Sequence, residues 1–531
     1  MIYFIPAWYQ QNNWYENEQS WHVRRMHTEF DDTVKQVQLF HRSGAYPYRI
    51  MLLGFSPNFR HFLHRQSVYR APYWSCFDAI QEIRRGKARL LSVHNLSWPA
   101  GVEFIYTPFV LVAMLDGEKY AQVEYGEDGN PIRIDMYENG RIHRRNIYDD
   151  RGFLSASIVY EDGNPVYQDY LMESGSRKLR CFLQDGHVEI NSSHPNYLLN
   201  YEGTEYTKRF SKQIYESLEE VIDEVLSAYL TLTKDEDLFC AAMHERHTDV
   251  LLDALYEKKL ILSFFKERYD LNSQPRGLEL MKKASYIITD SRENSREIRG
   301  KLGHAVQHIT DITPFDTRMD TGINLQFSVQ KILVPVDGMP EERFAQIVKL
   351  LGNYFASNAN ARVCLFTREA DYNRKGFLLE KTRKILKEVG MPEGWALEEV
   401  APSLGENKLE DEKSIPVKFV VEQCVEELAV SMCLKEQRVI ADLRDVPELY
   451  LQIMAVSIGI PQIVLAENQF ARHGKNGYAI QDLSKLPEAL VYYLDGMANW
   501  NDAQVHSYKL GKKYTTSVLL AKWKEVIESV E

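Results

Sequence analysis

The chain has 531 residues, with 44% hydrophobic and 26% charged side chains and a net charge of −12. This composition supports a large folded core and excludes an intrinsically disordered chain. The negative charge repels polyanions, so we expect no nucleic-acid partner.

The sequence has no signal for a membrane span, an export leader or a cofactor. No apolar run approaches the roughly 18 residues that a spanning helix needs, and residues 1–9 lack a basic leader and a cleavage site. The six cysteines form no Cys-x-x-Cys pair, which is typical of core residues in a reducing compartment, and the His pairs have no partner set. We therefore expect a cytoplasmic protein without cofactor or metal.

The chain opens with the pattern of a βαβ unit. Segments 3–5 and 50–54 have the composition of buried strands, and Ser20–His41 between them is a helical candidate. Aromatic residues follow the first strand, at Trp8, Tyr9 and Trp14. They combine apolar area with a polar group, so they favour sugar stacking or an interface, with core packing as the alternative.

A basic segment comes next. Residues 1–100 carry twelve Lys or Arg against seven Asp or Glu, although the whole chain is acidic. The candidate patch consists of Arg84, Arg85, Lys87, Arg89 and Trp74. Cations mixed with aromatic rings favour an anionic membrane surface or an acidic partner, and the alternative is an ordinary solvated face.

Residues from about 100 to 200 alternate short strands with turn signals. The glycines of the first four turns, Gly129, Gly140, Gly152 and Gly163, are 11, 12 and 11 residues apart. Asp-Gly and Asn-Gly turns supply the positive φ angles of tight hairpins, so we predict an inserted antiparallel meander. Apolar residues from Ile214 to Leu226 then recur at helical spacing.

Strands and helices alternate through the rest of the chain. Two apolar strands are predicted at 260–265 and 286–289, and a second α/β unit opens at Lys331. This unit alternates strands and helices up to a strand at 462–465, with a surface loop at 402–416. Such alternation predicts parallel sheets covered on both faces, whose ligands bind at the carboxyl ends of the strands.

Several stretches resemble the two-Rossmann glycosyltransferase architecture called GT-B. They are Ala284–Ser291, Gly459–Ile463, Asn476–Tyr478, Trp500 and Trp523. More specifically, the opening Phe4–Tyr9, the segment from Glu448 to Ile463 and the meander resemble the first member of the Asp group of accessory Sec system secretory proteins.

The resemblance implies an α/β fold of two Rossmann-like domains in GT-B arrangement, with the antiparallel β-meander inserted. The implied domains are an N-terminal Rossmann-like domain (1–100 and 200–325), the β-sheet extension (100–200), a C-terminal Rossmann-like domain (326–505) and a helix returning to the first domain (506–531). The implied partners are two sister Asp proteins, the accessory SecA motor ATPase and a serine-rich glycosylated adhesin.

The resemblance also implies a degenerate donor site. Retaining enzymes of this fold place cations after the first donor-domain strand to stabilise the leaving diphosphate, and they carry two glutamates seven residues apart. This chain has Asp337 after that strand, and Arg343 is the nearest cation along the sequence. Asp442, Glu448 and Gln452 stand near the positions of the glutamates, with an uncharged amide at the second.

We therefore predict a non-catalytic scaffold of the accessory Sec pathway, required for adhesin export. We expect this scaffold to be cytoplasmic. In a variant of the same hypothesis, the basic segment places it at the inner face of the cell membrane. The alternatives are an active glycosyltransferase that modifies the same adhesin, or an adaptor that binds glycan or lipid.

Overall fold

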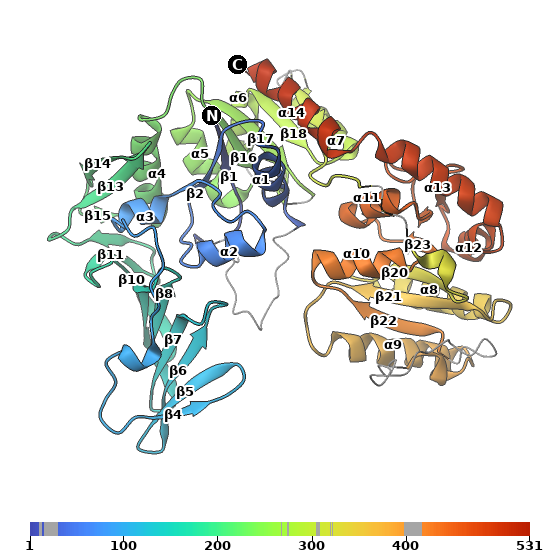
Figure 1. Cartoon of the computed structure of the whole chain (residues 1–531), viewed down its shortest axis with the longest axis horizontal. Helices are drawn as coiled ribbons and strands as arrows, with labels where there is room; N and C mark the ends of the chain where they lie inside the picture. The colour runs from blue at the N-terminus through green and yellow to red at the C-terminus, as the bar shows by residue number, and fades with distance from the viewer. Residues whose placement is uncertain are drawn as a thin grey trace. The chain divides into compact units, whose positions relative to one another are not determined.

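The computed structural model describes residues 1–9, 13–14, 30–266, 268–272, 275–303, 308–318, 320, 322–397 and 417–530. The chain divides into two compact units, each with its own hydrophobic core (Figure 1). Contacts assign Met1–Asp290, Asn294–Asp311 and Val526–Glu531 to the first unit, and Ser291–Glu293 and Ile312–Glu525 to the second. The start of the helix predicted at 20–41 and the loop predicted at 402–416 lie outside the described residues.

The first unit contains a parallel sheet in the order β19-β18-β17-β16-β1-β2-β3. Its strands are β1 (Ile2–Ile5), β2 (Tyr48–Leu52), β3 (Tyr73–Ser75), β16 (Leu238–Ala242), β17 (Lys259–Phe264), β18 (Tyr286–Thr289) and β19 (Ile309–Asp311). All residues of β1, β16 and β18 are buried, because helices cover both faces. The predicted βαβ opening is confirmed by the parallel pairing of β1 with β2.

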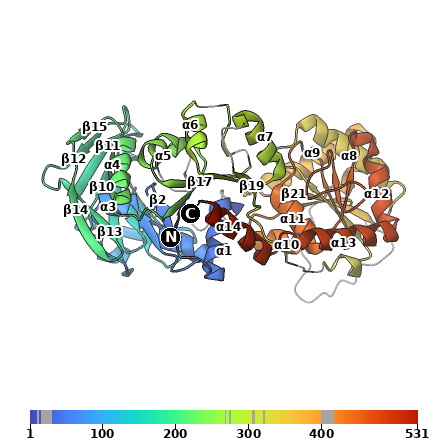
Figure 2. The same ribbon diagram turned by 90° about the horizontal axis from the view of Figure 1, so that it is seen from above.

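The helices of the first unit lie on both sides of this sheet. They are α1 (Asp32–Ser43), α2 (Phe59–Arg65), α3 (Cys76–Ile80), α4 (Leu218–Leu230), α5 (Thr248–Ala254), α6 (Pro275–Lys283) and α7 (Arg292–Leu302). Figure 2 shows α1 on one face and α5 and α6 on the other. Asp31 caps α1 by accepting hydrogen bonds from the backbone N–H groups of Thr33 and Val34, and Gly44 ends it with a φ of 59°.

The predicted antiparallel meander is also confirmed. It forms a sheet in the order β15-β12-β11-β10-β9-β8-β7-β6-β5-β4, with β4 and β15 at its edges. Its strands are β4 (Glu103–Tyr106), β5 (Val110–Leu115), β6 (Glu118–Tyr125), β7 (Pro131–Glu138), β8 (Arg141–Asp149), β9 (Phe153–Glu161), β10 (Asn164–Leu171), β11 (Arg177–Phe182), β12 (Val188–Ile190) and β15 (Ile214–Tyr215). The four turn glycines named above have positive φ angles, as tight hairpins require. A separate hairpin joins β13 (Asn196–Tyr201) to β14 (Thr204–Arg209).

The second unit is built on a parallel sheet in the order β22-β21-β20-β23-β24-β25. Its strands are β20 (Gln330–Pro335), β21 (Ala361–Thr367), β22 (Phe419–Gln423), β23 (Val439–Asp442), β24 (Gln462–Val464) and β25 (Gly477–Ala479). The helices are α8 (Glu341–Phe355), α9 (Arg374–Glu388), α10 (Glu427–Lys435), α11 (Leu449–Ile458), α12 (Leu486–Leu494) and α13 (Met497–Gly511). The last helix, α14 (Thr516–Val530), begins in this unit, and its residues from Val526 onward belong to the first unit. Figure 2 shows α8 and α9 on one face and α10 and α11 on the other.

Some local predictions are wrong. Ile214 belongs to β15 and is exposed, whereas the helix begins at Leu218, after Ser217 caps it. Strand β16 was not predicted, because its Cys-Ala-Ala ending lacks β-branched residues. Trp8, Tyr9 and Trp14 are buried, so among the alternatives for these aromatic residues the structure supports core packing.

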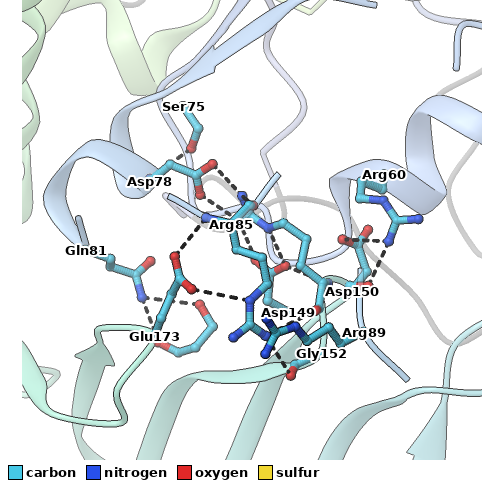
Figure 3. Close-up of polar contacts among 12 residues, drawn as sticks. Arg60, Ser75, Asp78, Gln81, Arg85, Arg89, Asp149, Asp150, Gly152 and Glu173 are labelled. Atoms are coloured by element: carbon cyan, nitrogen blue, oxygen red, sulfur yellow. Dashed lines mark hydrogen bonds and ion pairs between the residues drawn. The ribbon is translucent and has the colours of Figure 1, made fainter. Parts of the chain in front are cut away.

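One buried amide joins the meander to the α/β core of the first unit. Gln81, which directly follows α3, is 1% exposed. Its Nε2 donates to the carbonyl of Ser155 at 2.8 Å (Figure 3) and to that of Leu171 at 2.6 Å. These acceptors belong to the adjacent strands β9 and β10. A single side chain therefore satisfies two carbonyls of the meander where it meets α3.

We expect Gln81→Leu to lower the free energy of unfolding by about 2 to 6 kcal/mol, because it leaves two buried carbonyls without this donor and each costs about 1–3 kcal/mol. Chemical denaturation of the full chain measures this change. Gln213→Leu is the matched control, since its side chain is exposed and such substitutions stay within about 0.5 kcal/mol. Equal effects of the two substitutions would contradict the role given to Gln81.

Candidate functional site

Acidic and basic side chains of the second unit meet where parallel strands end. Asp337 lies two residues beyond β20, Arg368 directly follows β21, and Asp442 is the last residue of β23. Strand β20 pairs in parallel with both β21 and β23, so their carboxyl ends share one edge of the sheet. Polar ligands bind at this edge in open α/β sheets.

The carboxylate of Asp337 is held by neighbours from the next strand and helix. Its Oδ1 accepts from the Thr367 hydroxyl at 2.6 Å and lies 3.2 Å from Nη2 of Arg374. Its Oδ2 accepts from the backbone N–H of Arg368 at 2.7 Å. Arg374 also pairs with Glu369 at 3.0 Å. The Asp337 carboxylate therefore occupies donors that an anionic ligand could otherwise use.

A second set of ion pairs joins this edge to the start of α11. Arg444 makes a two-point contact with Asp442, from Nε to Oδ1 at 2.8 Å and from Nη2 to Oδ2 at 2.7 Å. Arg368 forms an ion pair with Glu448, whose backbone N–H donates to Asp442 at 3.0 Å. Burial alone lowers the pKa of Arg444, but the carboxylates of Asp442, Glu448 and Asp337 outweigh it and raise that pKa.

The structure thus brings three of the predicted donor-site residues, Asp337, Asp442 and Glu448, into one ion-pair cluster. Arg343 instead pairs with the exposed Asp445 at 2.8 Å. Gln452 lies buried in α11, and its Nε2 has no hydrogen-bond partner within the described part of the chain. Gln452 is therefore a buried packing residue outside the ion-pair cluster.

Sequence reasoning missed the three arginines of the cluster, Arg368, Arg374 and Arg444. A signal was present for two of them, because Arg368 directly follows β21 and Arg444 lies two residues beyond β23, and parallel strands place such residues at one edge. Arg374 is the first residue of α9. Together they offset the charges of Asp337, Asp442 and Glu448. The site is therefore rich in cations, as a phosphate site requires, but those cations are bound by acidic side chains of the chain itself.

The basic patch predicted in the first unit differs from a free cationic surface. Trp74 is buried and stacks on Tyr229 with ring centroids 4.2 Å apart, so its predicted place in an exposed membrane or partner patch is wrong. Arg84 pairs with Glu205 at 3.1 Å, and Arg85 pairs with Glu173 at 3.3 Å. This segment therefore exposes fewer unpaired cations and aromatic rings than its composition predicts.

Lys87 and Arg89 complete the predicted patch and are exposed. Among the described residues, neither side chain has an ion-pair partner. The Arg89 backbone N–H donates to the carbonyl of Arg151 at 3.1 Å. The segment is therefore tied to the meander through its backbone, and only two of its four cations remain for an outside partner.

The junction beneath this segment holds a buried charge network (Figure 3). Arg151 binds Asp149 through Nε at 2.7 Å and Asp78 through Nη2 at 2.8 Å. Asp150 accepts from the backbone N–H of His61 at 3.0 Å. Burial first, and then the charge of Asp149, raises the pKa of Asp150 to about 8. The network therefore keeps one buried carboxyl protonated at neutral pH.

A model of the family formed by the first Asp protein of the accessory Sec system matches residues 1–529. The chain belongs to this family, the first-Asp family. The first Asp protein of Streptococcus gordonii is 30% identical over 99% of this chain and 98% of its own length. The corresponding protein of Staphylococcus aureus strain NCTC 8325 is also 30% identical, over 99% of both chains. Membership of the first-Asp family gives the chain a role in the accessory Sec system.

Solved structures support the same assignment and the fold. In the crystal structure of accessory secretory proteins 1, 2 and 3 of Streptococcus pneumoniae, one chain aligns with a TM-score of 0.77 and 29% identity, covering 100% of this chain and 99% of that one. The pneumococcal O-GlcNAc transferase GtfA, solved with UDP and GlcNAc, aligns with a TM-score of 0.70 over 100% of this chain and 98% of its own. At 12% identity it shows the fold alone. The predicted GT-B fold class is confirmed.

Among the described residues of this first-Asp family chain, no helix combines the length and the hydropathy that a bilayer crossing demands.

We expect Asp150→Asn to change the pH dependence of stability. The folded pKa of Asp150, about 8, exceeds the unfolded value near 4, so between these values the folded state binds more protons than the unfolded one. Stability therefore falls as pH rises, by up to about 1.4 kcal/mol per pH unit, and the fall ends above the folded pKa. The variant should lose this decline between pH 6.5 and 9.

Denaturant unfolding of both proteins at each pH measures the difference. Burial lowers the pKa of His244 to about 4 and that of His247 to about 3, so these residues also make stability depend on pH where they titrate in the unfolded state. Both proteins carry these histidines, so the difference between the two curves isolates Asp150. Parallel curves for the two proteins would contradict a buried, protonated Asp150.

Proposed function

We propose that this first-Asp family chain is a non-catalytic scaffold that supports export of a serine-rich glycosylated adhesin through the accessory Sec system. In this proposal the chain binds two sister Asp proteins and acts with the accessory SecA motor. It retains a GT-B fold as a binding platform and does not transfer sugar.

The observation that carries the proposal is the occupied edge of the second sheet. A glycosyltransferase of this fold must present cations to the diphosphate of its donor, because negative charge develops there as the sugar leaves. Here Asp337 binds the backbone N–H of Arg368 and the guanidinium of Arg374. Asp442 binds Arg444 at two points. A diphosphate would have to displace carboxylates that are covalently part of the site.

The comparison with solved assemblies supports the partner proposal. The pneumococcal structure contains accessory secretory proteins 1, 2 and 3. A structure from Streptococcus agalactiae is named a glycosylation-associated protein (Gap123) complex, and one of its chains aligns with a TM-score of 0.77 and 30% identity. Those complexes favour a three-protein assembly for this chain as well.

One observation favours the alternative of an active transferase. Arg368, Arg374 and Arg444 surround the donor edge, and a ligand that outcompeted the acidic side chains would find three cations in place. Donor binding therefore separates the two functions.

We expect isothermal titration of the chain with UDP and with UDP-GlcNAc to show no saturable heat. The pneumococcal GtfA, which was solved with UDP and GlcNAc, serves as the positive control of the assay. Saturable binding that disappears in Arg444→Gln would place a nucleotide at this edge and contradict the non-catalytic proposal.

We expect deletion of the gene for this chain, in a host with the export system, to leave glycosylated adhesin inside the cell. Glycosylation is followed by lectin blot and surface display by protease accessibility. Full complementation by Arg444→Gln, checked for folding by circular dichroism, would fit a scaffold. An adhesin that loses its sugar after deletion and regains it only with the wild-type chain would instead indicate catalysis.

A further inference from the structure

Three metal-binding side chains meet at the end of β22, close to the arginine cluster. Glu422 belongs to β22, Cys424 lies just beyond it, and Cys433 belongs to α10. One carboxylate oxygen and the two sulfur atoms all lie within 4.8 Å of one another. In the portion of the chain that the structure describes, no other three His, Cys, Asp or Glu side chains meet this geometry.

The backbone holds this group in place from two directions. The N–H of Cys424 donates to the carbonyl of Thr367 at 3.0 Å, which extends the pairing of β22 with β21. Cys433 is fixed by α10, and the Gln437 amide one turn later donates to the Cys433 sulfur at 3.7 Å and to its carbonyl at 2.9 Å. The donors therefore come from a strand end and a helix that are already packed.

The donor set selects one class of cation. Thiolates are soft ligands that prefer zinc and similar ions, whereas Mg²⁺ and Ca²⁺ prefer oxygen donors. Two thiolates and a carboxylate make three protein ligands, which leaves a fourth position of a tetrahedral ion for water. Cys424 is buried, whereas Glu422 and Cys433 are half-buried.

We propose that Glu422, Cys424 and Cys433 form a binding site for a thiophilic divalent cation of the zinc class. Binding releases the two thiol protons to solvent and leaves both sulfurs as thiolates, so no electrons are transferred. The ion would join the end of β22 to α10. It would also adjoin the donor edge, because Thr367, which accepts from Cys424, donates its hydroxyl to Asp337.

The test uses Co²⁺ as a spectroscopic substitute for zinc. The full chain is stripped of metal with a chelator under a reducing agent and titrated with Co²⁺. We expect a thiolate-to-cobalt charge-transfer band that saturates at one ion per chain and disappears on addition of Zn²⁺. Cys424→Ser and Cys433→Ser should each abolish the band, and Glu422→Gln should weaken binding by about tenfold or more, since even outer partners of a metal contribute that much.

Cys181→Ser is the matched control, because Cys181 is a buried cysteine of the first unit and its loss should leave the band unchanged. Circular dichroism of each metal-free variant checks the fold. Absence of the band in the wild-type chain, or a band that survives both Cys424→Ser and Cys433→Ser, would overturn the proposal. A Cys424–Cys433 disulfide, found by mass spectrometry in chain purified with zinc and reductant present, would overturn it as well.

Discussion

A parallel sheet covered by helices on both faces leaves only the ends of its strands for charged side chains. This constraint decides where chemistry can occur in both units. In the second unit, it collects Asp337 and Asp442 at one edge together with the arginines that bind them. In the first unit, Arg268 follows β17 and pairs with Asp31 and Asp32. Since charges buried at these edges must be paired, the chain supplies its own counterions at both of these positions.

Patterns that depend on near neighbours could be read from the sequence. The Asp-Gly and Asn-Gly turns predicted the meander, because the positive φ angle that a tight hairpin requires depends only on the residues of the turn itself. The alternation of strands and helices predicted the two parallel sheets. Asp337, Asp442 and Glu448 were singled out through the family resemblance, and the structure brings them together. Local reasoning failed for Ile214, because the residue that starts a helix is set by its cap, Ser217, more than by apolar spacing.

Long-range pairing could not be read in the same way. Arg374 and Asp337 are 37 residues apart, and nothing in their local sequence says that one neutralises the other. Trp74 was misplaced for a related reason, because the composition of a segment does not report which side chains of a short strand turn inward. Cys424 and Cys433 match no metal-binding motif, since they meet across a strand-to-helix turn.

The antiparallel meander places its two edges far apart. Strand β15 leads directly into α4 of the α/β core, whereas β4 lies at the opposite edge, with mostly exposed residues. Neighbouring strands are about 4.8 Å apart, so nine such steps separate the edges by roughly 40 Å along the hydrogen-bonding direction. The meander therefore extends from the α/β core of the first unit as a long arm. A ligand that bound the exposed strand β4 would lie roughly 40 Å from β15, the strand through which the meander continues into α4 of the α/β core.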